Sequence, residues 1–374
     1  MNYTNHVYGL CDTDRTATTK RAAMYLRDIW YFALAGEGLK AGKLVHKVLL
    51  GEPLVFGRTA AGEAFALRDI CPHRGVPLSA GRILEGKASD CDVPLVECPY
   101  HGWRFRTDGA CAHIPSLVSG QDVEVERIRV RAYPVREVQG NIWVYMADEK
   151  RAEVTPDHEP PMMPGFEDRA PDIREAMNFS CHVDHAVIGL MDPAHGPFVH
   201  RAWWWRSAAS IHEKSKAFAP SELGFAMVEH QPSSNSLAYK ILGGKPTTEI
   251  AFRLPGIRIE RITVGRHRLV GLTCVTPIDE KTTEITQSFY WTMPFLTVFK
   301  PVARHFLRRF LGQDRDMVNL QQRGLKFDPR LMLINDADVQ AKWYQRLKHE
   351  WSASVEQGRP FENPVKPATL RWRS

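Results

Sequence analysis

The apolar residues of the first third of this chain fall in short runs that are separated by turn residues. Between Arg27 and Asp148, the runs rich in β-branched and apolar residues are Lys43–Leu50, Pro53–Arg58, Ala64–Asp69, Arg127–Tyr133 and Asn141–Tyr145. Gly51, Gly62, Gly109 and Gly140 punctuate this stretch, as hairpin turns require. The pattern predicts an all-β domain over residues 27–148, preceded by a tail of residues 1–26.

A stretch rich in proline and charge follows, and we interpret residues 149–172 as a linker. Beyond it, strands are expected at Ala226–His230, Ser236–Leu242, Thr248–Leu254, Ile257–Val264, Leu269–Thr276 and Thr283–Trp291. Because no helical pattern separates these runs, they predict a meandering antiparallel sheet.

Helical patterns come after the predicted sheet, at Val302–Leu311, Asp314–Arg323 and Asp336–Trp351. In the last of these, apolar residues recur every four positions, and Asn335 or Asp336 is a candidate N-cap. The whole pattern predicts an α+β protein whose second domain spans residues 173–374.

Composition changes this picture little. The chain has 374 residues, 44% of them hydrophobic and 25% charged, which is ordinary for a globular protein with a substantial core. The first thirty residues contain no apolar run of signal-peptide length, and no run elsewhere reaches the roughly 18 residues of a membrane span. We therefore expect a cytoplasmic protein without a membrane span. The seven cysteines are scattered, as reduced cytosolic thiols are. The net charge of +6 accompanies no nucleic-acid motif.

Two short segments in the all-β stretch carry metal-binding chemistry. They are Cys71-Pro72-His73-Arg74-Gly75 and Cys98-Pro99-Tyr100-His101-Gly102-Trp103, with 24 residues between His73 and Cys98. Two thiolates and two imidazoles suit a Rieske [2Fe–2S] centre, in which cysteines hold one iron and histidines the other. A tetrahedral zinc site could use the same ligands, although zinc sites usually pair like ligands.

A second candidate metal site lies near the start of the second domain. The segment from Asp192 to His200 reads D-x2-H-x4-H, with His195 and His200 as the histidines. Two histidines and one carboxylate can bind Fe(II) as a facial triad that leaves positions open for O2 and substrate. Alternatively, the histidines belong to a loop and hydrogen-bond to backbone groups.

The two boxes resemble those of Rieske proteins, C-x-H-x-G and C-x2-H-G-W, at every position. Val76 and Tyr100 stand where respiratory Rieske proteins have disulfide cysteines. Together with D-x2-H-x4-H, the order of motifs resembles the catalytic (alpha) subunit of Rieske non-haem iron aromatic-ring-hydroxylating oxygenases. The stretch from Leu190 to His195 is most similar to the pheophorbide a oxygenase and vanillate O-demethylase subgroup.

This resemblance implies a helix-grip-like catalytic domain and assigns residues. Cys71, His73, Cys98 and His101 would bind the cluster, and His195 and His200 the mononuclear Fe(II). Asp192 would bridge to His101 of a neighbouring subunit, commonly in a trimer. The third iron ligand would be a carboxylate on a C-terminal helix, where Asp314 and Asp316 are the candidates.

Helical phase separates these two carboxylates. Asp314 shares a face with apolar residues such as Leu311 and Val318, whereas Asp316 aligns with Arg309 and Arg323. We therefore expect Asp314 to be the ligand, unless Gly312 breaks the helix.

Other residues are weaker candidates. His182 and His185 could be ligands but lack the spacing, so a structural role is expected. Gly189 replaces an asparagine of close relatives. Trp203, Trp204 and Trp205 would pack over the metal pocket or contact substrate, and Tyr100 and Trp103 would shield the cluster.

The function implied is a terminal oxygenase component that takes electrons from a separate NAD(P)H-linked reductase, directly or through a ferredoxin. It would use O2 to hydroxylate or O-demethylate an aromatic or polycyclic substrate, as a monooxygenase or a dioxygenase. The reductase must be separate because the chain has no G-x-G-x-x-G fingerprint. A Rieske electron carrier without oxygenase activity and a zinc-binding structural protein are the alternatives.

Overall fold

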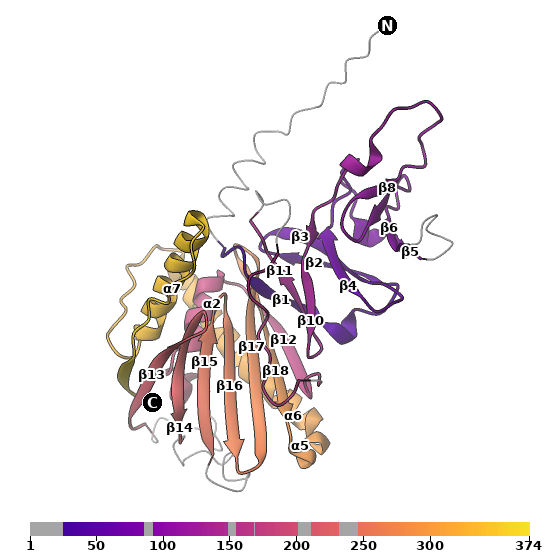
Figure 1. The fold of residues 1–374 in the computed structure, drawn as a ribbon. Coiled ribbons are helices and arrows are strands. Elements are labelled where there is room, and N and C mark those ends of the chain that lie inside the picture. The colour runs from indigo at the N-terminus through magenta and orange to yellow at the C-terminus, as the bar shows by residue number, and fades with distance from the viewer. Residues whose placement is uncertain (1–24, 86–92, 149–154, 168, 201–210, 232–245) are drawn as a thin grey trace.

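The computed structural model describes residues 25–85, 93–148, 155–167, 169–200, 211–231 and 246–374. Small antiparallel sheets make up the N-terminal part, and one large antiparallel sheet with helices on one side makes up the rest (Figure 1). The predicted α+β class and the order of the two halves are therefore confirmed.

Three sheets form the N-terminal part. The first consists of β2 (Leu44–Leu49), β3 (Glu52–Arg58), β4 (Ala64–Arg68) and β9 (Ala132–Tyr133), in that order. The second consists of β5 (Arg82–Leu84), β6 (Leu95–Glu97), β7 (Arg104–Arg106) and β8 (Cys111–His113), and the third has the order β1 (Trp30–Ala35), β11 (Asn141–Tyr145), β10 (Val135–Val138). Single 3-10 turns occur at Gly36–Gly38, Leu78–Ala80 and Val125–Arg127.

The strand expected at Arg127–Tyr133 is wrong over most of its length. Only Ala132–Tyr133 joins a sheet, since the preceding residues bond to the turn around Gly109 and Cys111 instead. Strand β1 was not predicted, because a run that is buried on both sides shows no alternation of apolar and polar residues.

The second half is built on a sheet with the order β12-β18-β17-β16-β15-β14-β13-β19. Its strands are β12 (Ile173–Phe179), β13 (Glu213–Ser221), β14 (Gly224–His230), β15 (Thr247–Arg253), β16 (Ile257–Val264), β17 (His267–Asp279), β18 (Thr282–Trp291) and β19 (Ala368–Arg373). The central strands match the prediction closely, whereas β12, β13 and β19 were missed. The strand expected at Ser236–Leu242 lies outside the described residues.

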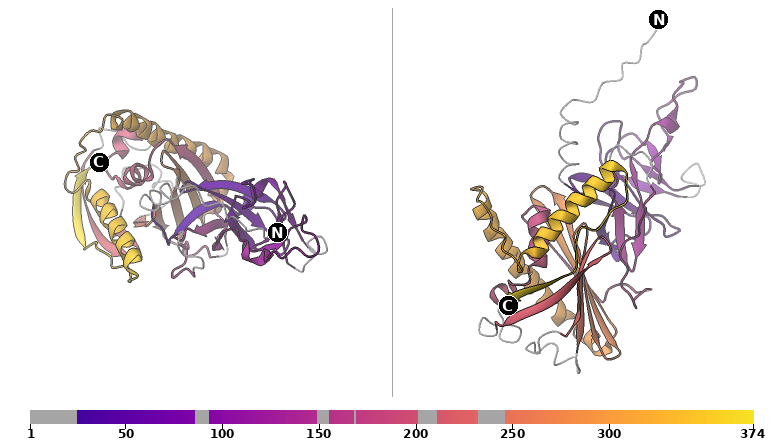
Figure 2. Two further views of the ribbon diagram at one scale, coloured as in Figure 1. Left: turned by 90° about the horizontal axis from the view of Figure 1, so that it is seen from above. Right: turned by 60° about the vertical axis from the view of Figure 1, so that its left-hand side comes forward.

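The two faces of this sheet have different partners. Ile257 and Ile259 on one face share a core with Trp30 and Trp143 of the three-stranded sheet. The opposite face is covered by helices (Figure 2), whose buried residues share a core with Phe225 and Phe252 of the sheet. Successive side chains of a strand point to opposite faces of the sheet, so each strand can contact the N-terminal part with one set of residues and the helices with the other.

The helices on the covered face are α2 (Val183–Met191), α3 (Gly196–Val199), α5 (Pro294–Val298), α6 (Lys300–Leu325) and α7 (Val339–Gln357). The two helices predicted around Gly312 form one continuous helix, α6. A glycine inside a helix costs only about 1 kcal/mol relative to alanine, which packing of the helix against β12 and α2 outweighs. Helix α7 begins at Val339, and its C-cap is Gly358 at φ 63°.

The described part of the predicted linker, residues 155–167 and 169–172, packs against the rest of the protein. Met163 and Phe166 are buried in the core beside the large sheet. The Gln139 side chain donates to the carbonyl oxygens of Met163 and Phe166 and accepts from the Met163 N–H. The main core likewise includes Phe56 and Val144 of the N-terminal sheets beside Val187 and Leu347. The two halves are therefore packed together through shared apolar cores.

Candidate metal centres

The two cysteine–histidine loops have the same backbone design. In the first, the Cys71 N–H donates to the Val76 carbonyl at 2.9 Å, and the Gly75 N–H donates back to the Cys71 carbonyl at 2.9 Å. In the second, the Cys98 N–H donates to the Trp103 carbonyl at 2.8 Å, and the Gly102 N–H donates to the Cys98 carbonyl at 3.1 Å. Gly75 and Gly102 have φ of 71° and 68°, which explains the glycine that closes each box.

The loops bring together two buried thiols and two exposed imidazoles. Cys71 and Cys98 are almost fully buried and lie side by side, without a disulfide. Burial raises the pKa of the Cys71 thiol to about 11, and the neighbouring Cys98 adds to this increase. The rings of His73 and His101 are exposed, with centroids 4.6 Å apart.

This arrangement fits a [2Fe–2S] cluster of the Rieske type. Two adjacent thiols on the inner side and two adjacent imidazoles on the outer side match a cluster with one cysteine-bound and one histidine-bound iron. The Trp103 ring stacks on the His73 ring with a centroid distance of 4.7 Å, so it covers one side of that imidazole. The Tyr100 ring lies against the His101 ring with a centroid distance of 3.9 Å, but Tyr100 is 56% exposed, so it covers the site only in part.

A buried carboxylate beneath the first loop was not anticipated from the sequence. Asp69 accepts hydrogen bonds from the Ser79 N–H at 2.7 Å and the Ser79 hydroxyl at 2.6 Å. Its other contact is the His46 ring, with Nδ1 2.5 Å from the Asp69 Oδ2. These bonds tie the residues that flank Cys71 to the neighbouring sheet. An aspartate at the end of a strand is too common to identify such a role without coordinates.

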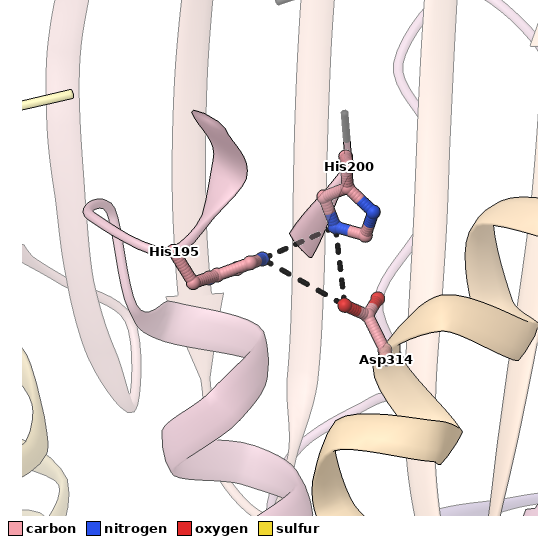
Figure 3. A group of neighbouring side chains, drawn as sticks. All are labelled: His195, His200 and Asp314. Atoms are coloured by element: carbon pink, nitrogen blue, oxygen red, sulfur yellow. Dashed lines mark hydrogen bonds and ion pairs between the residues drawn. The ribbon is translucent and has the colours of Figure 1, made fainter. Parts of the chain in front are cut away.

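The second candidate site joins three side chains from two distant parts of the chain. The Nε2 atoms of His195 and His200 are 3.2 Å apart (Figure 3). The Asp314 Oδ1 lies 3.1 Å from the His200 Nε2 and 3.7 Å from the His195 Nε2. Among the described residues, these three form the group whose ligand atoms all lie within 4.8 Å of one another.

These distances fit a facial triad. A metal about 2.1 Å from each ligand atom, with bond angles near 90°, would separate neighbouring ligand atoms by about 3.0 Å. The shortest separations here are close to that value, and the donor set of two imidazoles and one carboxylate is the one that non-haem Fe(II) uses.

The end of α2 and the short helix α3 direct both histidine rings toward the same point. Helix α2 ends at Met191, and its C-cap is Asp192, whose N–H donates to the Ile188 carbonyl. The Asp192 side chain then accepts the Ala194 N–H at 2.7 Å, which turns the chain into α3. His195 and His200 are the N-cap and C-cap of this single-turn helix, so the five-residue spacing returns both rings to one side.

Asp314 and Asp316 differ as their helical phase predicts. Asp314 lies on the side of α6 that faces the two histidines. The Asp316 side chain is 62% exposed and pairs with Arg315. Because α6 continues through Gly312, the phase relation between Leu311 and Asp314 is preserved.

The two imidazoles have different partners on their outer sides. The His195 Nδ1 is 3.6 Å from the Asp192 Oδ2, and about a third of the Asp192 side chain is exposed. Burial lowers the pKa of His195, but hydrogen bonding and charge from Asp192 and charge from Asp314 outweigh it and raise the pKa above its usual value. The His200 Nδ1 instead lies 3.1 Å from the amide oxygen of Gln313, and its ring stacks on Phe310.

The remaining candidates lie away from the triad or outside the described residues. His182 caps α2 by accepting the Asp184 N–H, which is a structural role, and His185 is outside the three-residue group. A Cβ on Gly189 would meet nothing within 4 Å, so packing does not require a glycine there. Trp203, Trp204 and Trp205 lie outside the described residues.

Comparisons with known proteins agree with both halves. Residues 29–134 match the family of the Rieske [2Fe-2S] domain, and residues 179–354 match the vanillate O-demethylase oxygenase C-terminal domain. Crystallised dicamba monooxygenase with dicamba bound has a similar fold, with a TM-score of 0.67 and 22% identity, covering 90% of this chain and all of that one.

Similar sequences come from several organisms. Chlorophyllide a oxygenase of Chlamydomonas reinhardtii is 38% identical over 48% of this chain and 25% of its own length. The toluene-4-sulfonate monooxygenase iron-sulfur subunit of Comamonas testosteroni is 34% identical over 48% of this chain and 46% of its own length. The oxygenase component of dicamba O-demethylase from Stenotrophomonas maltophilia is 31% identical over 62% of this chain and 61% of its own.

These matches therefore span between about a quarter and three fifths of the relatives' lengths. Within the described residues, no helix is both long and apolar enough to cross a membrane. The matching of two domain families in this order, on a fold that has the same two halves, confirms the resemblance drawn from the motifs. The chain therefore carries a Rieske [2Fe–2S] domain, followed by a domain that matches the vanillate O-demethylase oxygenase C-terminal family.

Proposed function

We propose that this protein is the terminal oxygenase component of a system that hydroxylates or O-demethylates an aromatic or polycyclic compound. The observation that carries the proposal is the group of His195, His200 and Asp314, whose ligand atoms lie within 4.8 Å of one another. An electron carrier needs the Rieske site alone. A second site with two imidazoles and one carboxylate has a use only if a metal acts there.

Each cofactor has a defined set of ligands in this proposal. Cys71, His73, Cys98 and His101 hold the [2Fe–2S] cluster, and His195, His200 and Asp314 hold Fe(II). When bound, the cluster supplies single electrons and the Fe(II) supplies the capacity to activate O2. The electrons originate from a separate NAD(P)H-linked reductase, with or without a ferredoxin.

The side chains around the two sites have distinct tasks. The buried thiols of Cys71 and Cys98 face inward, whereas His73 and His101 present their imidazoles at the surface. An exposed imidazole N–H is a hydrogen-bond donor that an outside carboxylate can reach. At the other site, the Asp192 carboxylate orients His195 and has oxygen atoms accessible to solvent. It can therefore accept a hydrogen bond from a partner and hold a proton when one is released.

The two sites are far apart within one chain. In Figure 1, strands β5, β6 and β8 around the cysteine–histidine loops lie at the upper right, whereas α2, which leads to the triad, lies on the left. We propose that the electron passes between subunits: it leaves the cluster of a neighbouring chain through His101 of the partner subunit and reaches Asp192 and His195 of this chain.

Exposed apolar side chains near the triad support a partner at this place. Phe198 between the two histidines is 53% exposed, and Met317 and Leu320 on α6 are 45% and 49% exposed. A contact between the cluster loops of one chain and the triad side of the next joins two different surfaces, and such contacts form a ring when the rotation between subunits closes. We propose a homotrimer, the ring that the family resemblance implies.

The substrate class rests on the relatives. Those named above act, by their names, on dicamba, toluene-4-sulfonate and chlorophyllide a. The arginines on the large sheet give weaker guidance, since Arg253, Arg258 and Arg261 each pair with a glutamate at 3.0 Å. We also propose a cytoplasmic location, which the five described cysteines, all unpaired, support.

A screen tests the oxygenase assignment. The purified protein and a surrogate reductase would be mixed with aromatic acids, aryl ethers and polycyclic compounds, while NADH and O2 consumption are followed. A substrate that stimulates both, with about three irons per chain, is the expected result. About two irons per chain and no stimulation by any compound would favour the electron carrier.

A further inference from the structure

His200 is held on three sides by one helix. Its ring stacks on Phe310 with a centroid distance of 3.5 Å and an angle of 15°. Its Nδ1 lies 3.1 Å from the Gln313 amide oxygen, and its Nε2 lies 3.1 Å from the Asp314 carboxylate. His200 is only 4% exposed, so water cannot readily replace these contacts.

We infer that Gln313 is a positioning residue that sets the tautomer of His200 for metal binding. This inference rests on the proposed ligand set. An amide oxygen accepts hydrogen bonds, so it favours the imidazole with its proton on Nδ1. The lone pair then resides on Nε2, the atom that faces His195 and Asp314. A metal-bound histidine is commonly fixed in this manner through its other nitrogen.

The spacing on α6 explains how one helix does this. Phe310, Gln313 and Asp314 are separated by three and four residues, and such residues lie on neighbouring parts of a helix surface. Leu307 and Leu311 of the same helix are buried in the cores on its inner side. The helix is thus fixed by packing, and one of its turns supplies a ligand and also orients a second ligand.

The partner of His200 is neutral, whereas that of His195 is charged. The His195 Nδ1 faces the partly exposed Asp192 carboxylate, and the buried His200 Nδ1 faces an amide. An amide oxygen is a hydrogen-bond acceptor, as a carboxylate oxygen is, but it carries no charge. The proposed electron route through Asp192 therefore uses the imidazole with the anionic partner.

Metal binding tests this role without turnover. The protein would keep its Rieske cluster, have its mononuclear metal removed by a chelator, and be titrated with Fe(II) and, separately, Co(II) in the absence of O2. Gln313→Leu should raise the dissociation constant by about 10- to 100-fold and shift the Co(II) absorption bands, because loss of such a bond typically weakens binding by this factor. Gln313→Glu retains an acceptor and should bind within a few-fold of the unmodified protein.

Two controls separate the possible outcomes. Gln321→Leu changes an exposed glutamine on the same helix and should leave the affinity unchanged. An unchanged dissociation constant and Co(II) spectrum in Gln313→Leu would overturn the inference, as would equal losses in Gln313→Leu and Gln313→Glu. Asp314→Ala tests the ligand set itself: if this variant bound metal normally, the proposed function would fail, whatever Gln313 does.

Discussion

The cluster site and the mononuclear site differ in how they draw their ligands from the chain. Each cluster loop carries one cysteine and one histidine within a tight turn, and both turns project from small sheets. The mononuclear site combines His195 and His200, around a single-turn helix, with Asp314 from a long helix more than a hundred residues later. The first site therefore depends on turn geometry, and the second depends on how two helical segments pack.

This difference predicts that the sites can be emptied independently. Cys98→Ser removes a ligand of the cluster and should abolish the Rieske EPR signal and visible absorption. Iron should fall from about three per chain to about one, since the triad keeps its ligands. Cys111→Ala, which changes another buried thiol in the same lobe, should retain the cluster. A normal Rieske signal in Cys98→Ser would show that the ligand assignment is wrong.

The converse change should empty the other site. Asp314→Ala leaves two imidazoles without the carboxylate, so iron should fall to about two per chain and substrate-dependent O2 consumption should vanish, while the Rieske spectrum persists. Iron analysis and EPR on one sample measure both. Asp316→Ala alters an exposed carboxylate two residues away and should behave as the unmodified protein does. Equal behaviour of the two variants would contradict the helical-phase argument.

A third change should separate the two sites functionally while leaving both loaded. Asp192→Asn keeps the size of the side chain but removes the charge beside His195. We expect normal iron content, and electron transfer from cluster to iron that is slower by about 10- to 100-fold. Stopped-flow absorbance of the pre-reduced cluster, mixed with O2 and a substrate from the screen, measures the rate. Asp316→Asn is the control, and normal turnover by Asp192→Asn would rule out the bridging role.

The smallest effect concerns the core that the two regions share. Asp184 on α2 accepts hydrogen bonds from the Tyr344 hydroxyl at 2.7 Å and the Lys348 ammonium at 2.6 Å on α7. Asp184→Asn should lower the free energy of unfolding at neutral pH by about 1–3 kcal/mol, the usual range for a hydrogen-bonded charged group. Because Phe56 and Val144 pack in the same core as Val187, far-UV circular dichroism and cluster absorbance should be lost together. Two separate transitions would contradict a shared core.

The same residue predicts a pH dependence. Burial raises the pKa of the Asp184 carboxyl, but charge and hydrogen bonding from Lys348 and a hydrogen bond from Tyr344 outweigh it and lower the pKa below its usual value of 3.8. The folded state thus favours the ionised form. Its stabilising contribution is present above the usual pKa and is lost as the pH falls through the lower, folded-state value. Denaturant unfolding at pH 3 and pH 7 should show a smaller effect of Asp184→Asn at the acidic pH.

Prediction from sequence worked best where local patterns carry the structure. Strands β11 and β16 appear with the expected bounds, because a glycine directly precedes each strand and β16 also alternates between apolar and polar residues. Strands β1 and β12 were missed for different reasons: β1 is apolar almost throughout, whereas the edge strand β12 alternates only weakly. The break predicted at Gly312 did not occur, since a local propensity of about 1 kcal/mol cannot outweigh the packing of a long helix.

The sequence by itself determined the class of protein, the four residues of the cysteine–histidine loops and the two histidines of the second site. These features are encoded within a few residues of one another, where spacing and turn chemistry are sufficient. Helical phase favoured Asp314 over Asp316, but only the tertiary structure decided that this carboxylate meets the two histidines and that Gln313 and Phe310 hold His200. These contacts join segments more than a hundred residues apart, and their distances depend on how α6 packs against the sheet and α2, which no local pattern specifies.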